Sequence, residues 1–364
     1  MSTTTQTTSQ APTCAASTGH TTVIVGSGLA GWTVARELRA LLPQGRIIVI
    51  SADAGDFYSK PMLSNAFALK KTVDGLVAMA GAAQATKVGV DLMAHTDVRA
   101  IDTAAQTLHT SGGDVHYDQL VLAVGADPIR LSMPGDEYVL SVNNWQDYAA
   151  FRAALDGCTD AANPGRRARV LIMGAGLIGS EFANDLITGG HEVHVVDPGE
   201  RPLAALLAPE QSAGLQQALV DLGVRFHLGT TATGVSVGDD GAKHVTLSNA
   251  GVVTADVVLS AVGLRARTAL AVASGLEVGR GIHVDAMGQT SAPNVYAVGD
   301  CAAYASAAKP ELFDGAPRGL PFVLPIMTAA KAIAKTLAGE PTPIVFAPMA
   351  VRVKTPAFPL SVQA

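Results

Sequence analysis

The chain of 364 residues is too long for one ordinary hydrophobic core, and its length predicts two domains with a small appendage. Hydrophobic residues make up 48% of the sequence and charged residues 15%, and there are 37 glycines. This composition is typical of α/β proteins with buried sheets and excludes a disordered or coiled-coil protein. The formal net charge of −6 provides no basic surface, so we expect neither nucleic acid nor an anionic membrane as a partner.

The cysteines and the N-terminal residues bear on the cellular compartment. Cys14, Cys158 and Cys301 are far apart and odd in number, so the sequence predicts neither a disulfide framework nor a metal site and favours a reducing compartment. Residues 1–19 are rich in Thr and Ser and lack Lys and Arg, which predicts a disordered tail and not a signal peptide. Every apolar run is interrupted too soon to cross a membrane. We therefore expect a cytoplasmic protein.

Two copies of one strand, turn and helix signal organise the sequence. In the first copy, a β-branched run precedes a glycine-rich turn, an amphipathic stretch and a second strand-like run, at 21–25, 26–31, 32–42 and 46–50. The second copy repeats this order at 169–173, 174–179, 180 to about 188, and 192–196. The sequence therefore predicts an α/β protein with two similar units.

The turns GSGLAG and GAGLIG carry the chemistry of this repeat. The first glycine of each permits a tight turn, the second lets the backbone approach a pyrophosphate, and the third allows close packing of the helix. The N-terminus of the helix attracts the phosphate charge. A single such turn would also fit a plain strand-to-helix connection, but two copies with their strands predict two dinucleotide sites.

The two sites differ at the end of the second strand, where a carboxylate would bind the adenosine ribose. Asp197 occupies this position in the second copy, and Pro198-Gly199-Glu200 behind it offers no cation for a 2′-phosphate, so we expect NAD in preference to NADP. In the first copy the position is Ser51, followed by Ala52 and Asp53, so a hydroxyl and backbone groups are expected to replace the carboxylate.

A third signal is NVYAVGDCA, residues 294–302, in which a short strand leads to Gly299 and Asp300. An acid at such a strand end can accept hydrogen bonds from a polyol, whereas Asp300 taken alone would equally suit a turn or a helix N-cap.

Together with FYSKPMLS, LVLAVGADPIR, GAGLIGSEFANDL, VVLSAVGLRART and VKTPAFPL, these stretches make the chain resemble the FAD-dependent pyridine nucleotide oxidoreductases, flavoproteins with two dinucleotide-binding domains. The resemblance implies FAD at the first site, NADH at the second, and two Rossmann-like three-layer domains in which the NAD domain is inserted into a discontinuous FAD domain. The expected limits are a tail at 1–19, FAD-domain segments at 20–131 and 264–318, an NAD domain at 132–263, and an apparently shortened flavin-covering segment at 319–364.

The resemblance also implies residue roles. It places the FAD pyrophosphate at Ser27, Gly28, Leu29 and Ala30 between Gly26 and Gly31, the ribose at Ser51 and Ala52, the adenine near Val98, the ribityl chain at Asp300 and the flavin pyrimidine at Val323. The corresponding NAD residues are Gly174, Gly176, Leu177, Ile178, Gly179 and Asp197, and Gly125, Arg130 and Gly263 are further cofactor-binding candidates.

Lys60 and Lys354 are expected to approach the isoalloxazine, and Glu181 is expected to lie near flavin and nicotinamide. A cation there would stabilise negative charge arriving on the flavin, and we expect Glu181 to hold Lys60 in place, with both acting as catalytic residues. An exposed loop lysine and an ordinary helix-surface glutamate are the alternatives.

The chain has Ser59-Lys60-Pro61 where related disulfide reductases carry paired cysteines, and Cys301 has no second thiol near it in sequence, so it is expected to be a small buried residue. The resemblance therefore implies an external one-electron iron carrier protein as acceptor. FYSKPML and VKTP favour rubredoxin, with ferredoxin or flavorubredoxin as alternatives. A flavin-bearing redox sensor that responds to NADH without turnover is a further alternative. Lys331 and Lys335, on an expected helix at 323–337, either steer an acidic carrier or form a plain solvated face.

Overall fold

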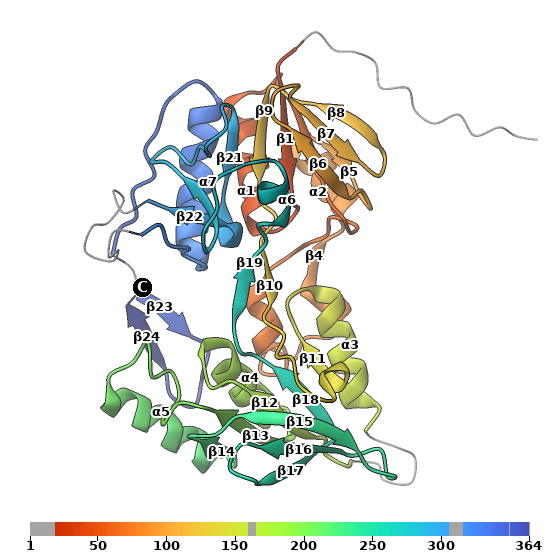
Figure 1. The fold of residues 1–364 in the computed structure, drawn as a ribbon, viewed down its shortest axis with the longest axis vertical. Helices are drawn as coiled ribbons and strands as arrows, with labels where there is room; N and C mark the ends of the chain where they lie inside the picture. The colour runs from red at the N-terminus through yellow and green to blue at the C-terminus, as the bar shows by residue number, and fades with distance from the viewer. Residues whose placement is uncertain (1–18, 159–164, 306–315, 349, 364) are drawn as a thin grey trace, which may run out of the picture.

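The computed structural model describes residues 19–158, 165–305, 316–348 and 350–363, in which two parallel sheets form the centres of two bodies. Of the predicted tail, all but Gly19 lies outside these described residues. Figure 1 shows the two bodies one above the other, with strands β10 (Ala126–Pro128) and β19 (Leu264–Ala266) between them. These two crossover strands pair with each other in an antiparallel ladder.

The first sheet has the strand order β21-β9-β1-β2-β5, and all its pairs are parallel. Its strands are β1 (Thr21–Val25), β2 (Arg46–Ile50), β5 (Asp91–Met93), β9 (Gln119–Leu122) and β21 (Val295–Ala297). The β1 strand is buried along its whole length, as expected for a parallel sheet with both faces covered. Because β21 follows the second sheet in the chain, the first body is discontinuous in sequence.

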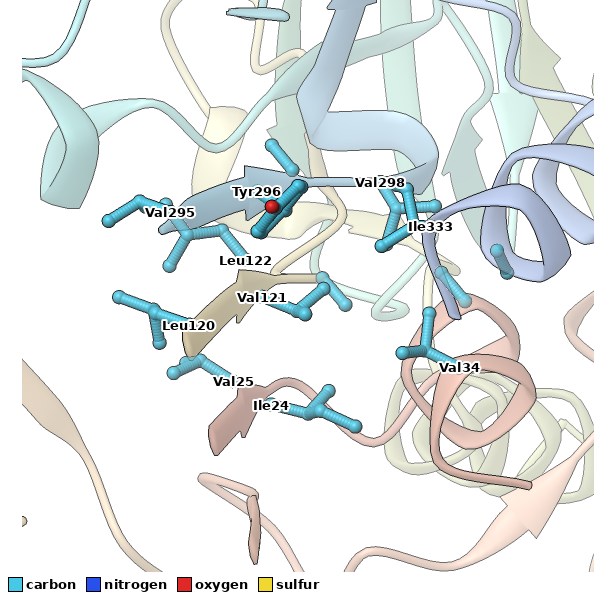
Figure 2. Packing of buried hydrophobic residues seen from close by; sticks show 14 of the residues in the cluster. Ile24, Val25, Val34, Leu120, Val121, Leu122, Val295, Tyr296, Val298 and Ile333 are labelled. Carbon is cyan, nitrogen blue, oxygen red and sulfur yellow. The ribbon is translucent and has the colours of Figure 1, made fainter. Parts of the chain in front are cut away.

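Helices and a small antiparallel sheet cover the first sheet. The helices are α1 (Leu29–Leu41), α2 (Gly81–Val88) and α7 (Val323–Leu337), and the small sheet consists of β6 (Val98–Asp102), β7 (Thr107–Thr110) and β8 (Gly113–His116). Helix α7 packs against α1. Figure 2 shows Val34 of α1 and Ile333 of α7 in one buried cluster with Ile24, Val121 and Val298. The turn before α1 is thereby held at the carboxyl end of β1.

The second sheet repeats this design with the order β11-β18-β12-β13-β14, again entirely parallel. Its strands are β11 (Val139–Ser141), β12 (Arg169–Met173), β13 (Glu192–Asp197), β14 (Arg225–Leu228) and β18 (Val257–Ser260). Its covering elements are α3 (Trp145–Asp156), α4 (Leu177–Thr188), α5 (Pro209–Asp221) and the antiparallel strands β15 (Ala232–Val237), β16 (Lys243–Leu247) and β17 (Val252–Ala255). In chain order, the antiparallel strands lie between the third and fourth strands of the first parallel sheet and between the fourth and fifth strands of the second.

Short elements connect the two bodies and complete their edges. They are β3 (Phe57–Tyr58), β4 (Val77–Met79), α6 (Ala269–Ala273), β20 (Ile282–Val284), β22 (Ala302–Tyr304), β23 (Ala350–Val353), β24 (Leu360–Gln363) and the 3-10 helices η1 (Lys60–Asn65), η2 (Asp74–Leu76), η3 (Asp136–Tyr138) and η4 (Gly299–Cys301). Strands β23 and β24 form an antiparallel hairpin beside α4 and α5 (Figure 1). Val353 and Val362 of this hairpin belong to the core of the second body.

The predicted fold class is confirmed: the chain is an α/β protein with two Rossmann-like bodies, and the second body is inserted into the first. No helix among the described residues is long and apolar enough to cross a membrane.

Candidate cofactor sites and active site

The first glycine-rich turn is built as its spacing predicts. Gly26 has a φ of 111°, and a Cβ there would collide with the carbonyl oxygen of Ala123, while a Cβ on Gly31 would collide with the carbonyl oxygen of Gly26. Gly28 is the N-cap of α1 and forms no side-chain cap, and a Cβ on it would meet nothing within 4 Å. The first N–H groups of the helix therefore face open space, into which a phosphate fits.

The second turn has the same geometry. Gly174 has a φ of 105°, a Cβ on Gly179 would collide with the carbonyl oxygen of Gly174, and Gly176 is an N-cap with nothing within 4 Å of its missing Cβ. Leu177 and Ile178 form the first turn of α4. No acidic side chain occupies the first turn of either α1 or α4, so both helix ends are compatible with an anion.

A cavity of about 1180 Å³ extends from the first turn toward the second body. This volume exceeds the roughly 300–1,000 Å³ of an ordinary small-ligand pocket, as a dinucleotide requires. Eight predicted residues line it: Gly26, Ser27, Gly28, Ser51, Ala52, Lys60, Val98 and Gly125. Asn143, Asn144, Gln146 and residues 265–267 also line the cavity, although none of them was predicted to bind a cofactor. The first three lie at the start of α3, outside every motif, whereas residues 265–267 lie in and directly after β19, within the stretch VVLSAVGLRART.

The end of the cavity that is predicted to bind a ribose contains a carboxylate. The Ser51 hydroxyl lies 2.6 Å from Ser27 Oγ and donates to Asp53 Oδ1 at 2.6 Å, and Asp53 lines the cavity. Asp53 Oδ1 also accepts from the backbone N–H of Gly55 at 2.8 Å. Beside the predicted hydroxyl and backbone groups, this end of the cavity therefore also offers a carboxylate, because the strand stops before Ser51 and the loop returns Asp53 to the same hydroxyl.

At the second site, Asp197 is fixed by two backbone groups. Its Oδ2 accepts from the N–H of Ala175 at 2.6 Å, and its Oδ1 accepts from the N–H of Gly199 at 2.7 Å. The carboxylate thus lies directly beside the glycine-rich turn, at the end of β13. There it can accept a hydrogen bond from a ribose hydroxyl and repel a 2′-phosphate.

Lys60 is the first residue of η1 and projects into the large cavity. Its Nζ donates to Asn143 Oδ1 at 2.9 Å. The side chain is exposed to the cavity, yet the surrounding walls desolvate the ammonium, and this desolvation lowers the pKa of Lys60. The carboxylate of Asp300 opposes this effect, and burial raises the pKa of Asp300 itself.

Glu181 has a different partner from the one expected. Its side chain is 1% exposed, forms an ion pair with Lys354 Nζ, and accepts from the Lys354 backbone N–H at 3.0 Å and from Ser64 Oγ at 2.7 Å. The expectation that Glu181 holds Lys60 was wrong. The hairpin β23–β24 brings Lys354 to α4, whereas the turn of η1 that follows Lys60 presents the hydroxyl of Ser64 to the same carboxylate.

A second acid on α4 holds the segment after η1. Asp185 is 1% exposed, and its carboxylate accepts from the backbone N–H of Phe67 at 3.0 Å and of Ala68 at 2.8 Å. The guanidinium of Arg152, on α3, lies 4.1 Å from the centroid of the Phe67 ring. The segment that carries Lys60 belongs to the first body by sequence, but it is anchored on helices of the second.

The remaining predicted residues lie outside the large cavity. Val323 begins α7 and is 43% exposed, and its N-cap Phe322 forms no side-chain cap. Arg130 instead lines a small cavity of about 20 Å³ with Ser141, Met173 and Ser260, at the carboxyl ends of strands of the second sheet. Gly263 has a φ of 111° between β18 and β19, so it serves the crossover.

The two cysteines among the described residues form no redox pair. Cys301 is fully buried, and burial raises its pKa to about 11, so the expectation of a small buried residue is confirmed. Cys158 is half-buried at the end of α3, and Cys14 lies outside the described residues. No group of three or more His, Cys, Asp and Glu suited to a metal occurs in the described part of the chain.

The family model for pyridine nucleotide-disulphide oxidoreductases matches residues 20–333. The rubredoxin-NAD(+) reductase of Alcanivorax borkumensis is 42% identical over 345 residues, which cover 94% of this chain and 85% of that protein. The nitric oxide reductase FlRd-NAD(+) reductase of Aeromonas salmonicida is 39% identical over 341 residues, covering 93% and 82%.

Solved structures agree with these sequence relatives. A ferredoxin reductase from Rhodopseudomonas palustris superposes with a TM-score of 0.82 at 28% identity, covering 92% of this chain and 80% of that one. The reductase in a covalent putidaredoxin reductase–putidaredoxin complex gives a TM-score of 0.81 at 29% identity, covering 93% and 79%. The resemblance expected from the sequence is confirmed, and the chain belongs to the pyridine nucleotide-disulphide oxidoreductase family.

Proposed function

We propose that the protein is an FAD-containing, NADH-dependent reductase that passes electrons to a small iron carrier protein, rubredoxin first among the candidates. Bound FAD supplies the chemistry, because it accepts a hydride from NADH and releases electrons one at a time. The observation that carries the proposal is the large cavity, which begins at the first glycine-rich turn and ends at Lys60 and Asn143, where both bodies contribute to its wall.

The residues divide into binding and charge-stabilising groups. In our proposal the N-terminus of α1 binds the FAD pyrophosphate, Ser51 and Asp53 bind its ribose, Val98 contacts the adenine, and Asp300 holds the ribityl chain. Gly28 at the N-terminus of α1, Ser51 with Asp53, and Val98 all line the cavity, as these roles require. The N-terminus of α4 with Asp197 would bind NADH.

Lys60 faces the reacting end of the cavity, and no carboxylate in the described part of the chain contacts its ammonium directly, so its positive charge acts on the cavity. Lys354 and Val323 would border the flavin from the C-terminal segment. We place the domain limits at the crossovers, near Leu131 and Gly263.

The cysteines support an external acceptor. The thiol of Cys301 is fully buried, and burial raises the pKa of both Cys301 and Cys158, so neither described thiol is a readily ionised internal acceptor. The relatives named for rubredoxin and for FlRd favour a rubredoxin-type carrier, while the solved relatives named for ferredoxin and putidaredoxin keep a ferredoxin as the alternative. The free cysteines and an NADH donor fit a cytoplasmic location, which we propose as well.

An anaerobic titration of the purified protein with NADH, followed by addition of rubredoxins, flavorubredoxin domains and ferredoxins, tests the proposal. We expect NADH to bleach the oxidised flavin band and rubredoxin to restore it with rapid steady-state turnover. Turnover with ferredoxin alone would reassign the carrier. Flavin reduction without turnover on any iron protein, combined with an NADH-dependent change in assembly, would establish a redox sensor instead.

A further inference from the structure

We propose that Asn143 is a positioning residue that holds the Lys60 ammonium in the wall of the large cavity and does so without cancelling its charge. This inference rests on the proposed function, in which Lys60 faces bound FAD. Asn143 lies outside every motif that predicted the site, in the short segment between β11 and α3.

The contacts of Asn143 determine which way its amide points. Its Oδ1 accepts from Lys60 Nζ at 2.9 Å, and its Nδ2 donates to the carbonyl oxygen of Ala126 at 2.8 Å. The opposite orientation would place the NH₂ group against the ammonium and the amide oxygen against a carbonyl oxygen. Only this orientation gives each of the two contacts one donor and one acceptor, so the acceptor offered to Lys60 is fixed.

The backbone of Asn143 is fixed as well. Its N–H donates to Asp147 Oδ2 at 2.9 Å, while the N–H of Asp147 donates to Asn144 Oδ1 at 2.6 Å. This reciprocal arrangement caps α3 and resembles a capping box. With 6% of its surface exposed, Asn143 has little freedom to change rotamer. Lys60 thus donates to a preorganised amide oxygen. Through its Nδ2, the same Asn143 side chain links the second body to the crossover strand β10 at Ala126.

The two lysines proposed to lie near the flavin, Lys354 and Lys60, have different kinds of hydrogen-bond partner. Lys354 forms an ion pair with the buried carboxylate of Glu181, which neutralises its charge. Lys60 is held by a neutral amide. The charge of Asp300 acts on Lys60, but the hydrogen bond of the described Lys60 side chain goes to Asn143 and not to Asp300. An ion pair would cancel most of the field of the ammonium, whereas an amide oxygen leaves it. The arrangement at Lys60 is therefore suited to a cation that stabilises charge developing in the cavity.

The first test measures Lys60 itself in the FAD-loaded protein. The pKa of Lys60 is followed by NMR of 13Cε-labelled lysines, with its signal identified by its absence in Lys60→Met. Asn143→Asp keeps the side-chain shape and adds a carboxylate, so the pKa of Lys60 should rise by about 1–3 units. Asn144→Asp is the matched control: it retains the helix cap and adds the same charge one residue away, so it should raise this pKa by much less. An unchanged Lys60 pKa in Asn143→Asp, or equal shifts in the two variants, would overturn the proposal.

The second test asks whether Asn143 acts through Lys60. In single-turnover stopped flow, Asn143→Ala should slow reduction of bound FAD by NADH roughly tenfold to a hundredfold, the cost of misplacing a group by about 1 Å. The same change made in a Lys60→Met background should have little further effect, because the group it positions is gone. A full additional loss in that background would contradict the proposal. Neither test requires a carrier, so failure to reduce any iron protein would count against the proposed function alone.

Discussion

The ion pair between Glu181 and Lys354 gives a prediction whose size follows from burial. Glu181 is 1% exposed and accepts three hydrogen bonds, whereas the Lys354 side chain is 26% exposed and can reach water. Removing Lys354 therefore strands a buried carboxylate, while removing the charge of Glu181 leaves an ammonium that solvent can hydrate. The two single substitutions should be unequal, although they break the same pair.

We expect Glu181→Gln to weaken the attachment of the β23–β24 hairpin by about 1–2 kcal/mol, the value of a hydrogen bond to a charged group discounted for the exposure of Lys354. Lys354→Met should cost more, about 2–4 kcal/mol, because among the described residues only Ser64 and the backbone N–H of residue 354 would remain as donors to Glu181. The double variant should be less destabilised than Lys354→Met alone, since neither partner then remains as a buried, uncompensated charge.

Hydrogen exchange of backbone amides in the hairpin measures this local opening, which suits a chain with two bodies better than one global unfolding transition. A difference of 1.4 kcal/mol appears as a tenfold change in the opening equilibrium. Amides of β1, in the other body, provide the internal control and should exchange as in the unaltered protein. If Lys354→Met opens the hairpin less than Glu181→Gln does, or if the two effects add, the account of this pair as a buried, coupled charge is wrong.

Four further substitutions test the cofactor sites. Gly28→Ala should leave the fold intact, because its Cβ would enter open space, but this Cβ would take up room at the proposed pyrophosphate site and should lower FAD affinity at least tenfold in a fluorescence titration. Gly31→Ala should instead reduce the yield of folded protein, because its Cβ would collide with the carbonyl oxygen of Gly26. Equal behaviour of the two variants would count against the turn geometry. The Asp300→Ala variant should purify with less bound flavin, as measured by absorbance. Full flavin occupancy in this variant would contradict the role assigned to Asp300. In the unaltered protein, kcat/KM with NADH should exceed kcat/KM with NADPH by on the order of tenfold or more, and Asp197→Ala should reduce this ratio. Equal values for the two nucleotides in the unaltered protein would refute the assignment of Asp197 to the adenosine ribose.

Local patterns predicted the parts of the fold that depend on neighbours in sequence. Both strands before the glycine turns have the predicted limits, and helix α4 ends at Thr188 as expected. Helix α1 begins at Leu29 and not at Trp32, because the turn itself supplies the first helical residues after Gly28. The glycine spacing succeeded because a collision within one turn is a local constraint.

Contacts between segments distant in sequence were harder to predict. The partner of Glu181 was wrong because two lysines, Lys60 and Lys354, both fit the same chemical role, and only the path of the C-terminal hairpin decides between them. Asn143 gave no signal, because a pair of asparagines before a helix is expected only to supply an N-cap, and Asn144 fills that role in α3. The place of Asp53 in the cavity wall was missed because it depends on a loop that turns back toward Ser51.

The anchoring of the η1 segment explains why this site needs both bodies. Glu181 and Asp185 are one helical turn apart on α4, and together they bind Ser64 and the backbone of Phe67 and Ala68. Lys60, at the start of the same segment, is held by the residue that precedes the N-cap of α3. The ammonium that faces the first cofactor site is therefore positioned by helices of the second body. A displacement of the second body would move this charge relative to the glycine-rich turn of the first, so the contacts that close the two bodies together also set the electrostatics of the cavity.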